Sequence, residues 1–371
     1  MITLTMRPYA GEADLEAIAS LINSCEAVDQ LDEGTSVSEL RQEFDDPSVD
    51  KARDIRLWEN VADFSRHVEK STLDLTPEPP SLQGKGENSK PLSLQERGLE
   101  RGFPDPVKSK ENVEGQLLGF GQLWIPESGE EIDGFLWFRV LPTARGGDLE
   151  KQIVAWGQGR MREVEPERGV QVKLRSGTRA DKSNHIALLE GCGFTADRYF
   201  FSMARSLAEP IPEPQLLEGF TLRHSEGEQD TEAWVEMFNQ SFIDHWNHHD
   251  LTVESYRHWR SDPDYRPELD LIAVATDGTF AAFCYCHINP EDNKRKEGNE
   301  GWIDVLGTRR GFRNRGLGRA MLLAGMQRLK AAGVDTARLG VDSENPNGAG
   351  QLYESVGFRK LYTRIMYVKD V

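Results

Sequence analysis

The sequence predicts an α/β fold with a mixed sheet, built twice along one chain. Each copy is expected to hold a mixed, mostly antiparallel sheet with flanking helices. The chain has 371 residues, of which 38% are apolar, so it is long enough for two ordinary globular cores. Short apolar strands and helix-period runs follow one another in both halves. The same polar landmarks recur in the two halves, which indicates an internal repeat.

The repeat is clearest at the start of each half, where an arginine at the end of a short apolar strand precedes an aspartate and an asparagine at fixed spacings. These residues are Arg7, Asp14 and Asn23 in the first half and Arg223, Asp230 and Asn239 in the second, at a constant offset of 216. Near the ends, the Gly-Phe pair at 193–194 matches the pair at 357–358 at an offset of 164. The first copy is therefore longer by 52 residues.

An insertion and a linker divide the chain. The segment at about 76–112 is rich in Pro, Gly, Ser, Lys and Glu and poor in apolar side chains, which is typical of a solvated, flexible insertion. We expect the deletion of Pro80–Val107 to cost little stability. Glu209–Pro214 carries three prolines and is interpreted as a linker. The predicted domains are residues 1–209 and 210–371.

The second half is expected to alternate strands and helices. A turn signal at Thr276–Thr279 joins two apolar runs as a hairpin, and Gly333 and Gly357 are placed to end helices. We predict helices at 231–242, 318–332 and 348–356, and strands at 271–275, 280–288, 302–306, 336–341 and 362–368.

Charge and composition exclude several classes of function. The formal net charge of −18 argues against nucleic acid and an anionic membrane surface as partners, and it is compatible with a cationic substrate. No run of eighteen apolar residues is present, and Met1–Pro8 has no signal pattern, so we expect neither a transmembrane helix nor export. Cys284 and Cys286 would share one face of a strand in the core. The four cysteines form no disulfide framework, so we expect a cytoplasmic protein.

The segment 306–319 carries the chemistry, because a strand ends there, a basic glycine-rich turn follows, and a helix begins at once. Such a turn points several backbone N–H groups outward, and the helix adds the positive end of its dipole. Gly316 and Gly318 let that backbone approach a bulky anion. The turn also holds five arginines: Arg309, Arg310, Arg313, Arg315 and Arg319. A pyrophosphate would fit this site, and the motifs of nucleotide hydrolases and dinucleotide-binding folds are missing.

The loop resembles a known family. The pattern Arg313-x-x-Gly316-x-Gly318 is similar to the Q/R-x-x-G-x-G/A pyrophosphate loop of the GNAT acyltransferase superfamily, and the segment 345–358 resembles its Asn…Leu-Tyr-Glu…Gly-Phe segment. The resemblance implies acetyl-CoA as co-substrate, and a splayed parallel strand pair that takes its pantetheine arm. The cofactor-binding residues it implies are Leu306, Gly307, Thr308, Arg313, Asn314, Arg315, Gly316, Leu317, Gly318, Arg319 and Asn345.

The same resemblance implies that Tyr353 faces the thioester sulfur, where its hydroxyl would act as general acid toward the leaving thiolate. A packing role for Tyr353, and a turn role for Asn345, remain alternatives. The general base is open between Asp304 and Glu300, on the strand that leads into the loop. Asp304 alternates with its neighbours, so we expect its face of the strand to differ from theirs. His287, at the end of a strand expected nearby, is a further candidate.

Histidines and carboxylates crowd the stretch Phe242–Asp250, which follows the first helix of the second half. No second cluster with a ligand pattern accompanies it, so we expect no metal. In the family that it resembles, this segment lines the acceptor pocket. An aromatic, acidic pocket wall for a cationic amine and a plain loop are the two interpretations.

The corresponding loop of the first half is expected to have lost its site. Asp148 and Glu150 stand where the second half has Gly316 and Gly318, and two carboxylates would repel a pyrophosphate. Leu189 stands where the second half has its tyrosine. We therefore expect one CoA site per chain, in the second half, with the first half as a structural or substrate-shaping partner.

The resulting prediction is an N-acetyltransferase that moves an acetyl group from acetyl-CoA to a primary amine of a small molecule, by direct attack in the C-terminal domain. Two-domain members of the GNAT superfamily show the same tandem arrangement. The alternatives are a non-catalytic acyl-CoA-binding or regulatory module and a protein N-acetyltransferase. The expected assembly is a monomer or homodimer.

Overall fold

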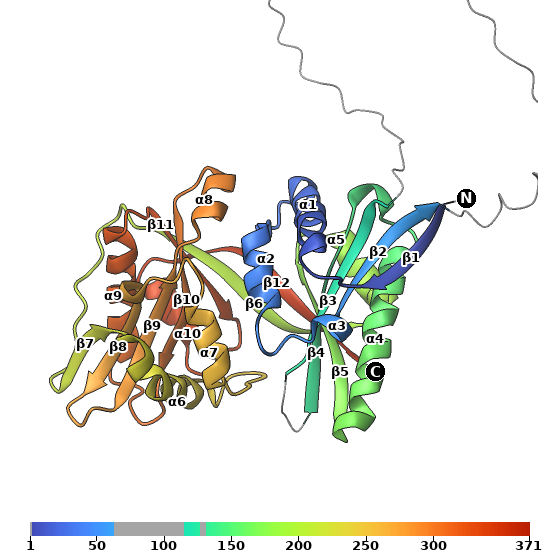
Figure 1. Cartoon of the computed structure of the whole chain (residues 1–371). Helices are drawn as coiled ribbons and strands as arrows, with labels where there is room; N and C mark the ends of the chain where they lie inside the picture. The colour runs from blue at the N-terminus through green and yellow to red at the C-terminus, as the bar shows by residue number, and fades with distance from the viewer. Residues whose placement is uncertain (1, 63–114, 127–130) are drawn as a thin grey trace, which may run out of the picture. The chain divides into compact units, whose positions relative to one another are not determined.

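The computed structural model describes residues 2–62, 115–126 and 131–371 (Figure 1). The predicted insertion at about 76–112, with its proposed deletion, lies outside the described residues. The chain falls into a small unit, Met1–Thr5 with Glu59–Gln116, and a large unit, Met6–Trp58 with Leu117–Val371. The large unit holds the polar landmarks of both repeats that the sequence predicts. Within the part of the chain that is described, no helix is long and apolar enough to cross a membrane.

The elements follow the same order twice. The first half comprises β1 (Ile2–Pro8), α1 (Glu12–Asp29), α2 (Val37–Phe44), α3 (Lys51–Asp54), β2 (Ile55–Ala62), β3 (Leu117–Trp124), β4 (Glu131–Val140), the 3₁₀ turn η2 (Pro142–Ala144), α4 (Leu149–Arg168), β5 (Gln171–Arg179), α5 (Ser183–Gly191) and β6 (Thr195–Ser206). The second half comprises β7 (Phe220–His224), η3 (Gly227–Asp230), α6 (Thr231–Phe242), α7 (Val253–Arg260), η4 (Pro267–Leu269), β8 (Asp270–Ala275), β9 (Phe280–His287), α8 (Pro290–Lys296), β10 (Glu300–Thr308), α9 (Leu317–Ala331), β11 (Thr336–Asp342), α10 (Ala349–Ser355) and β12 (Arg359–Asp370).

The polar landmarks of the repeat make the same contacts in both halves. The Arg7 guanidinium donates two hydrogen bonds to the Asp14 carboxylate, at 2.9 and 2.7 Å. Arg223 holds Asp230 in the same way, at 2.6 and 2.9 Å. In each half this pair fixes the start of the first helix against the strand before it.

The two asparagines of the repeat also make the same hydrogen bonds in both halves. The side chain of Asn23 bonds to the backbone N–H and C=O of Thr35, at 3.0 and 2.7 Å. Asn239 bonds in the same way to the backbone of Leu251, at 2.8 and 3.1 Å. Each asparagine therefore anchors the chain twelve residues beyond it, which explains why its spacing recurs.

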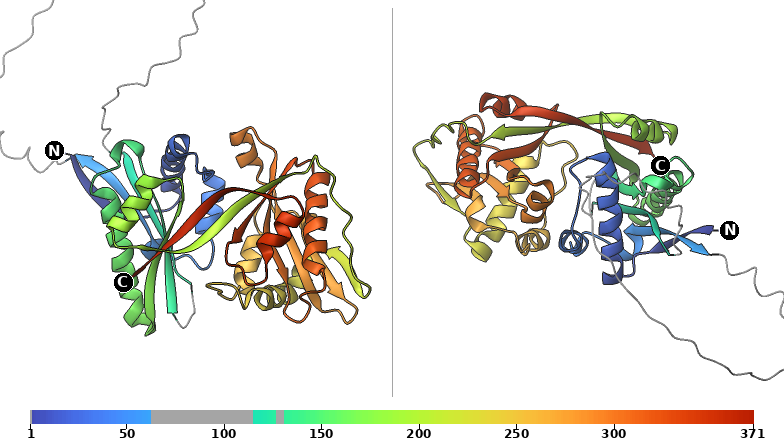
Figure 2. Two further views of the ribbon diagram at one scale, coloured as in Figure 1. Left: turned by 180° about the vertical axis from the view of Figure 1, so that it is seen from behind. Right: turned by 90° about the horizontal axis from the view of Figure 1, so that it is seen from above.

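The two halves exchange their last strands. In the large unit the strands are hydrogen-bonded in the order β3-β4-β5-β12-β6-β11-β10-β9-β8-β7. Strand β6 of the first half pairs antiparallel with β11, and β12 of the second half pairs antiparallel with β5. The two exchanged strands pair with each other at the centre, and Figure 2 shows them side by side in both views. Each half therefore completes the sheet of the other.

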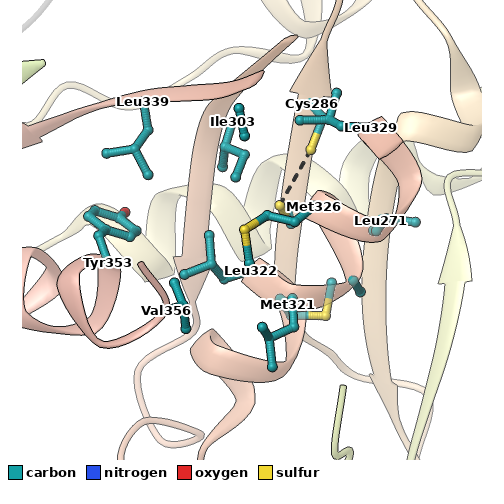
Figure 3. Packing of buried hydrophobic residues seen from close by; sticks show 14 of the residues in the cluster. Leu271, Cys286, Ile303, Met321, Leu322, Met326, Leu329, Leu339, Tyr353 and Val356 are labelled. Carbon is teal, nitrogen blue, oxygen red and sulfur yellow. Dashed lines mark hydrogen bonds between the residues drawn. The ribbon is translucent and has the colours of Figure 1, made fainter. Parts of the chain in front are cut away.

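The core of the second half lies between the sheet and α9. Gly325 of α9 faces the strand so closely that an added Cβ would lie 2.5 Å from the Cys284 sulfur and 3.0 Å from the Cys286 sulfur. Both cysteines are buried on this face, 3.7 Å apart, as the sequence predicts (Figure 3). Their role is core packing, and it brings α9 close to the sheet.

All the predicted helices and strands of the second half are confirmed, with their ends within three residues of the predicted ones. Helices α7 and α8 were not predicted from the sequence. Helix α7 is short and polar, with Tyr256 as its buried anchor and Thr252 as its N-cap. Helix α8 begins with Pro290 after the N-cap Asn289 and has no buried residue, so it offers no apolar period to detect.

Candidate active site

The site opens where two parallel strands separate. Strands β10 and β11 pair only from Glu300↔Thr336 to Trp302↔Arg338, over three residues of each. Beyond Trp302, β10 keeps its antiparallel partner β9 as far as Thr308. The edge of β10 that faces β11 is thus left without a strand partner along its second half. This is the splayed strand pair that the sequence resemblance implies.

The loop after β10 presents its backbone to this opening. Gly316 is the N-cap of α9 and has a left-handed φ of 78°, a conformation that glycine adopts without a Cβ penalty. A Cβ built on Gly316 would meet no atom within 4 Å, so the space in front of this backbone is open. The first N–H groups of α9 have no partner within the helix and point toward the same opening.

A glycine is needed at the end of β10 for a different reason. A Cβ on Gly307 would lie 2.3 Å from the ring of Phe283. The close approach of this aromatic side chain from β9 therefore excludes any larger residue at position 307.

A cavity of about 270 Å³ lies along this loop and the splayed strands. Its walls include all the predicted cofactor-binding residues except Arg315, together with Tyr353. Six further residues line the cavity: Ser241, Phe242, His245, Asn347, Ala349 and Leu352. Phe242 and His245 belong to the stretch Phe242–Asp250, for which the sequence left a pocket wall and a plain loop open. The other four were not predicted, and Ser241 carries no signal of its own.

The loop arginines are largely engaged with protein groups. Arg313 donates to the backbone oxygens of Thr308, at 3.2 Å, and Ser241, at 2.8 Å, and pairs with Asp244 at 2.6 Å. It therefore ties the loop to the end of α6. Arg310 also pairs with Asp244. Asp244 is thus the counter-ion of the loop and is not free to form an acidic wall for an amine.

Arg315 and Arg319 make different contacts from those of Arg313. Arg319 donates to the Ser355 hydroxyl at 2.7 Å, so it links α9 to α10. Arg315 is exposed and lies over the Phe312 ring, 5.7 Å from its centroid. Among the described residues, no group of three or more His, Cys, Asp or Glu side chains is arranged to hold a metal ion.

Tyr353 is buried in the wall of the cavity. Its side chain, from α10, belongs to the core cluster that includes Leu322 and Val356, and Figure 3 shows its hydroxyl turned toward the strand that carries Ile303. No group in the described ranges forms a hydrogen bond with that hydroxyl, so it is available to a ligand. Burial raises its pKa well above the usual value, which keeps it protonated at neutral pH.

Asn345 combines a structural contact with its place in the cavity wall. Its side-chain oxygen accepts hydrogen bonds from the backbone N–H groups of Asn347, at 2.9 Å, and Ala349, at 3.4 Å. This shapes the turn into α10. The turn role that the sequence left open is therefore real, and the residue lines the cavity as well.

Asp304 occupies a β-bulge. The register between β10 and β9 shifts between Ile303 and Val305, leaving Asp304 without a paired residue. Ile303 and Leu306 pack toward α9, whereas Val305 packs in the cluster formed by α6 and α7. The expectation that Asp304 faces away from both neighbours is thus wrong for Val305. The bulge inserts an extra residue, so strict alternation fails there.

The surroundings of Asp304 change its acidity. The protein crowds around its carboxyl group although water still reaches it, and this burial raises its pKa to about 6, against a smaller lowering by His287. The nearest carboxylate oxygen lies 3.9 Å from His287 Nδ1. Glu300 is paired with Arg338 at 2.9 Å. Of the two predicted carboxylates, Asp304 is the one without a Lys or Arg partner in the described structure.

The matching loop of the first half is blocked by the side chain of one of its own residues, Glu150. Glu150 is buried, and one of its carboxylate oxygens accepts a hydrogen bond of 3.0 Å from the backbone N–H of Gly146. A loop N–H is thus already paired with an internal anion. The Asp148 side chain is 87% exposed and lies at the N-terminus of α4.

The first half also lacks the catalytic candidates. By the loop alignment, Leu136 stands in place of Asp304, and the β3–β4 register passes through it with no bulge. Leu189 replaces Tyr353 and is fully buried. The second half alone combines an open loop, a bulged carboxylate and a tyrosine.

Comparison with known proteins shows the family of this chain. The model of the acetyltransferase (GNAT) family matches residues 231–358, which contain the loop, Asp304 and Tyr353. A mycothiol acetyltransferase of Thermobispora bispora is 34% identical over 254 residues, covering 68% of this chain and 80% of the relative. The chain belongs to the GNAT acetyltransferase family. It is an acetyl-CoA-dependent N-acetyltransferase, and its sequence also resembles the tandem arrangement of mycothiol synthase.

Solved structures show the same fold in other GNAT acetyltransferases. A GCN5-related N-acetyltransferase from Sphaerobacter thermophilus has a TM-score of 0.65 at 22% identity, covering 99% of this chain and 95% of the other. A tandem GNAT protein from the clavulanic acid biosynthesis pathway has a TM-score of 0.65 at 11% identity, covering 99% and 98%. At these identities the likeness concerns the fold.

Proposed function

We propose that this acetyltransferase moves the acetyl group of acetyl-CoA onto a primary amine of a small molecule, by direct attack in the second half. The proposal rests on one observation. The wall of a single cavity contains the open backbone of the loop, the unpaired edge of β10 and the free hydroxyl of Tyr353. The relatives named mycothiol acetyltransferase support a small-molecule acceptor.

Different residues of the second half would bind different parts of acetyl-CoA. The backbone at Gly316–Gly318 and the start of α9 would hold the pyrophosphate through N–H groups. The backbone of Leu306 and Thr308 would pair with the amides of the pantetheine arm, like an added strand. The thioester would then lie between the splayed strands, beside Tyr353.

Asp304 would act as the general base and Tyr353 as the general acid. Asp304 takes a proton from the ammonium form of the acceptor, whose nitrogen then attacks the thioester carbonyl carbon. As the carbon–sulfur bond breaks, Tyr353 gives its proton to the leaving sulfur, and solvent later restores it. His287, beside Asp304, would carry the proton away. Glu300, paired with Arg338, would hold the start of β10.

The acceptor can be identified by turnover. Release of free CoA thiol from acetyl-CoA would be measured with a panel of small primary amines, in which an amine related to mycothiol is one member because of the relatives' name. We expect thiol release with at least one amine and acetylated amine as the product. Tight CoA binding without thiol release for any amine would contradict the proposal and favour an acyl-CoA-binding module. Labelled polypeptide in place of labelled amine would favour a protein N-acetyltransferase.

We further propose that the protein is cytoplasmic and a monomer or homodimer. All four cysteines are free, in agreement with a reducing compartment. Sedimentation analysis of the purified protein would measure the assembly.

A further inference from the structure

A different cavity, of about 300 Å³, lies between α2 of the first half and α7 of the second. Both elements belong to the large unit. The side chains that characterise it are three carboxylates, two tryptophans and one amide: Glu43, Asp46, Asp262, Trp124, Trp259 and Gln122. No lysine or arginine lines it. Its chemistry is thus acidic and aromatic.

The carboxylates of this cavity have no basic partner. In the described ranges of the chain, no Lys or Arg side chain forms an ion pair with Glu43, Asp46 or Asp262. Burial raises the pKa of the Glu43 carboxyl, against a smaller lowering by its hydrogen bond with the Gln122 side chain, and no positive charge of the protein lowers it further. A bound cation would supply that charge.

Hydrogen bonds hold side chains of the cavity wall in place. The Trp124 indole N–H donates to the Ser48 hydroxyl at 3.2 Å, and that hydroxyl donates to the Asp46 carboxylate at 2.6 Å. An aromatic side chain and a carboxylate are therefore held in one network. Aromatic faces and carboxylates together are the groups that bind ammonium ions.

A buried amide oxygen that lacks a partner points to a missing hydrogen-bond donor. The Gln122 side chain is 5% exposed and lines the cavity, and its oxygen has no hydrogen-bond partner in the described structure. Leaving a buried acceptor unpaired costs about 1–3 kcal/mol. An ammonium group has N–H donors that would satisfy both this oxygen and the carboxylates.

The cavity adjoins the side of the sheet that carries Asp304. Trp259 packs edge-on against Tyr285, with ring centroids 4.8 Å apart. Burial raises the pKa of Tyr285, and the nearby Asp304 carboxylate raises it further. One pair of aromatic rings therefore connects the cavity wall with the proposed base.

The position of α2 over α7 is held by specific bonds. The Gln42 amide donates to the backbone oxygen of His258 at 3.0 Å, and His258 Nε2 lies 2.7 Å from the backbone oxygen of Gln42. The two walls of the cavity are thus fastened to each other at one edge.

We propose that this cavity binds a second cationic group of the acceptor, so that the enzyme prefers diamines or polyamines. One amine would be acetylated beside Asp304, while another ammonium group sits among Glu43, Asp46 and Asp262. This inference rests on the proposed function, because it assumes that the acceptor approaches Asp304.

The test compares acceptors of matched length. The full chain is assayed for thiol release from acetyl-CoA with linear α,ω-diaminoalkanes and with the linear monoamine of each length. We expect kcat/KM for the best diamine to exceed that of its monoamine by about tenfold or more, through a lower KM. Glu43→Gln and Asp262→Asn are each expected to reduce this ratio toward one. Glu254→Gln, an exposed carboxylate of α7 outside the cavity, is the control and should keep the ratio.

Calorimetry separates this inference from the proposed function. Diamine binding to the CoA-loaded protein is measured for the parent chain and Glu43→Gln. Equal kcat/KM for diamines and monoamines would overturn the inference and leave the function standing. Diamine binding that weakens in Glu43→Gln without any acetylation would overturn the function and leave the cation site standing. Diamine binding that is absent, or equal in both proteins, would also overturn the inference.

Discussion

At the scale of single residues, the site depends on which polar groups are left without protein partners. Arg313 and Glu300 are both engaged in ion pairs. Tyr353 and Asp304 are the groups that the surrounding protein leaves available, one protonated and one with a raised pKa. A protonated hydroxyl and an ionisable carboxyl group suit an acid and a base of one reaction.

Replacing Tyr353 by Phe should lower the single-turnover rate of acetyl transfer on the order of 10²- to 10³-fold, as is typical when a general acid is removed. The ring keeps its packing, and the KM for acetyl-CoA should change little because the acid acts mainly as the sulfur leaves. Rapid-quench measurement with saturating acetyl-CoA gives the rate. A change of less than about threefold would show that another group protonates the sulfur.

The raised pKa of Asp304 predicts a pH dependence. The base must be ionised to accept a proton, so kcat/KM should fall as the pH drops through about 6. Asp304→Asn should lower kcat/KM on the order of 10²- to 10⁴-fold and remove this acidic limb. Glu300→Gln is the comparison variant on the same strand and should keep the limb. An unchanged limb in Asp304→Asn would assign the base to another residue.

At the scale of elements, the strand–loop–helix unit of the second half differs from its repeat in the first by a few side chains. The loop of the second half is open at Gly316, whereas Glu150 closes the loop of the first half from within. The bulge in β10 has no counterpart in the β3–β4 register. These local differences distinguish the half with the candidate site from the half without one.

Gly316→Asp should abolish CoA binding in a folded protein. It places a carboxylate in front of the helix N-terminus and a Cβ at a left-handed φ of 78°. Gly311→Asp is a matched control, since it has a positive φ of 94° and an equally open Cβ position but does not line the cavity. Calorimetry should show one CoA per chain in the parent and in Gly311→Asp. Unchanged affinity in Gly316→Asp would place the pyrophosphate elsewhere.

At the scale of the whole molecule, the exchange of β6 and β12 makes the two halves depend on each other. Strand β11 pairs with β6 over seven residues, so the sheet of the second half ends on a strand of the first. Without it, β11 would present an unpaired edge. The first half is thus part of the scaffold of the site even though its own loop is closed.

A cut in the linker should leave the molecule assembled. A protease site placed at Glu209–Pro214, which is mostly exposed, would separate the halves covalently while β6 and β12 stay paired. We expect the cut protein to elute as one species in gel filtration and to keep CoA affinity within about twofold. Residues 210–371 expressed alone should be insoluble or unfolded. A stable, CoA-binding monomer of 210–371 would contradict this prediction.

Much of the site was predictable because its signals are local. The glycines at 316 and 318, the basic turn and Tyr353 lie in two short segments, and neighbours in sequence are neighbours in space there. The bulge at Asp304 was not predictable, because it is a property of pairing with β9. The ion pairs of Arg313 and Glu300 escaped prediction for the same reason, since their partners are distant in sequence.

The sequence by itself determined the tandem α/β repeat, the family and the half in which we propose the site, because spacing and residue type act within short stretches of chain. Only the tertiary structure decided that the halves exchange strands, that Asp304 is the available carboxylate, and that Glu150 closes the first loop. Each of these depends on which distant groups meet, and that is set by the pairing of strands and the packing of helices on the sheet.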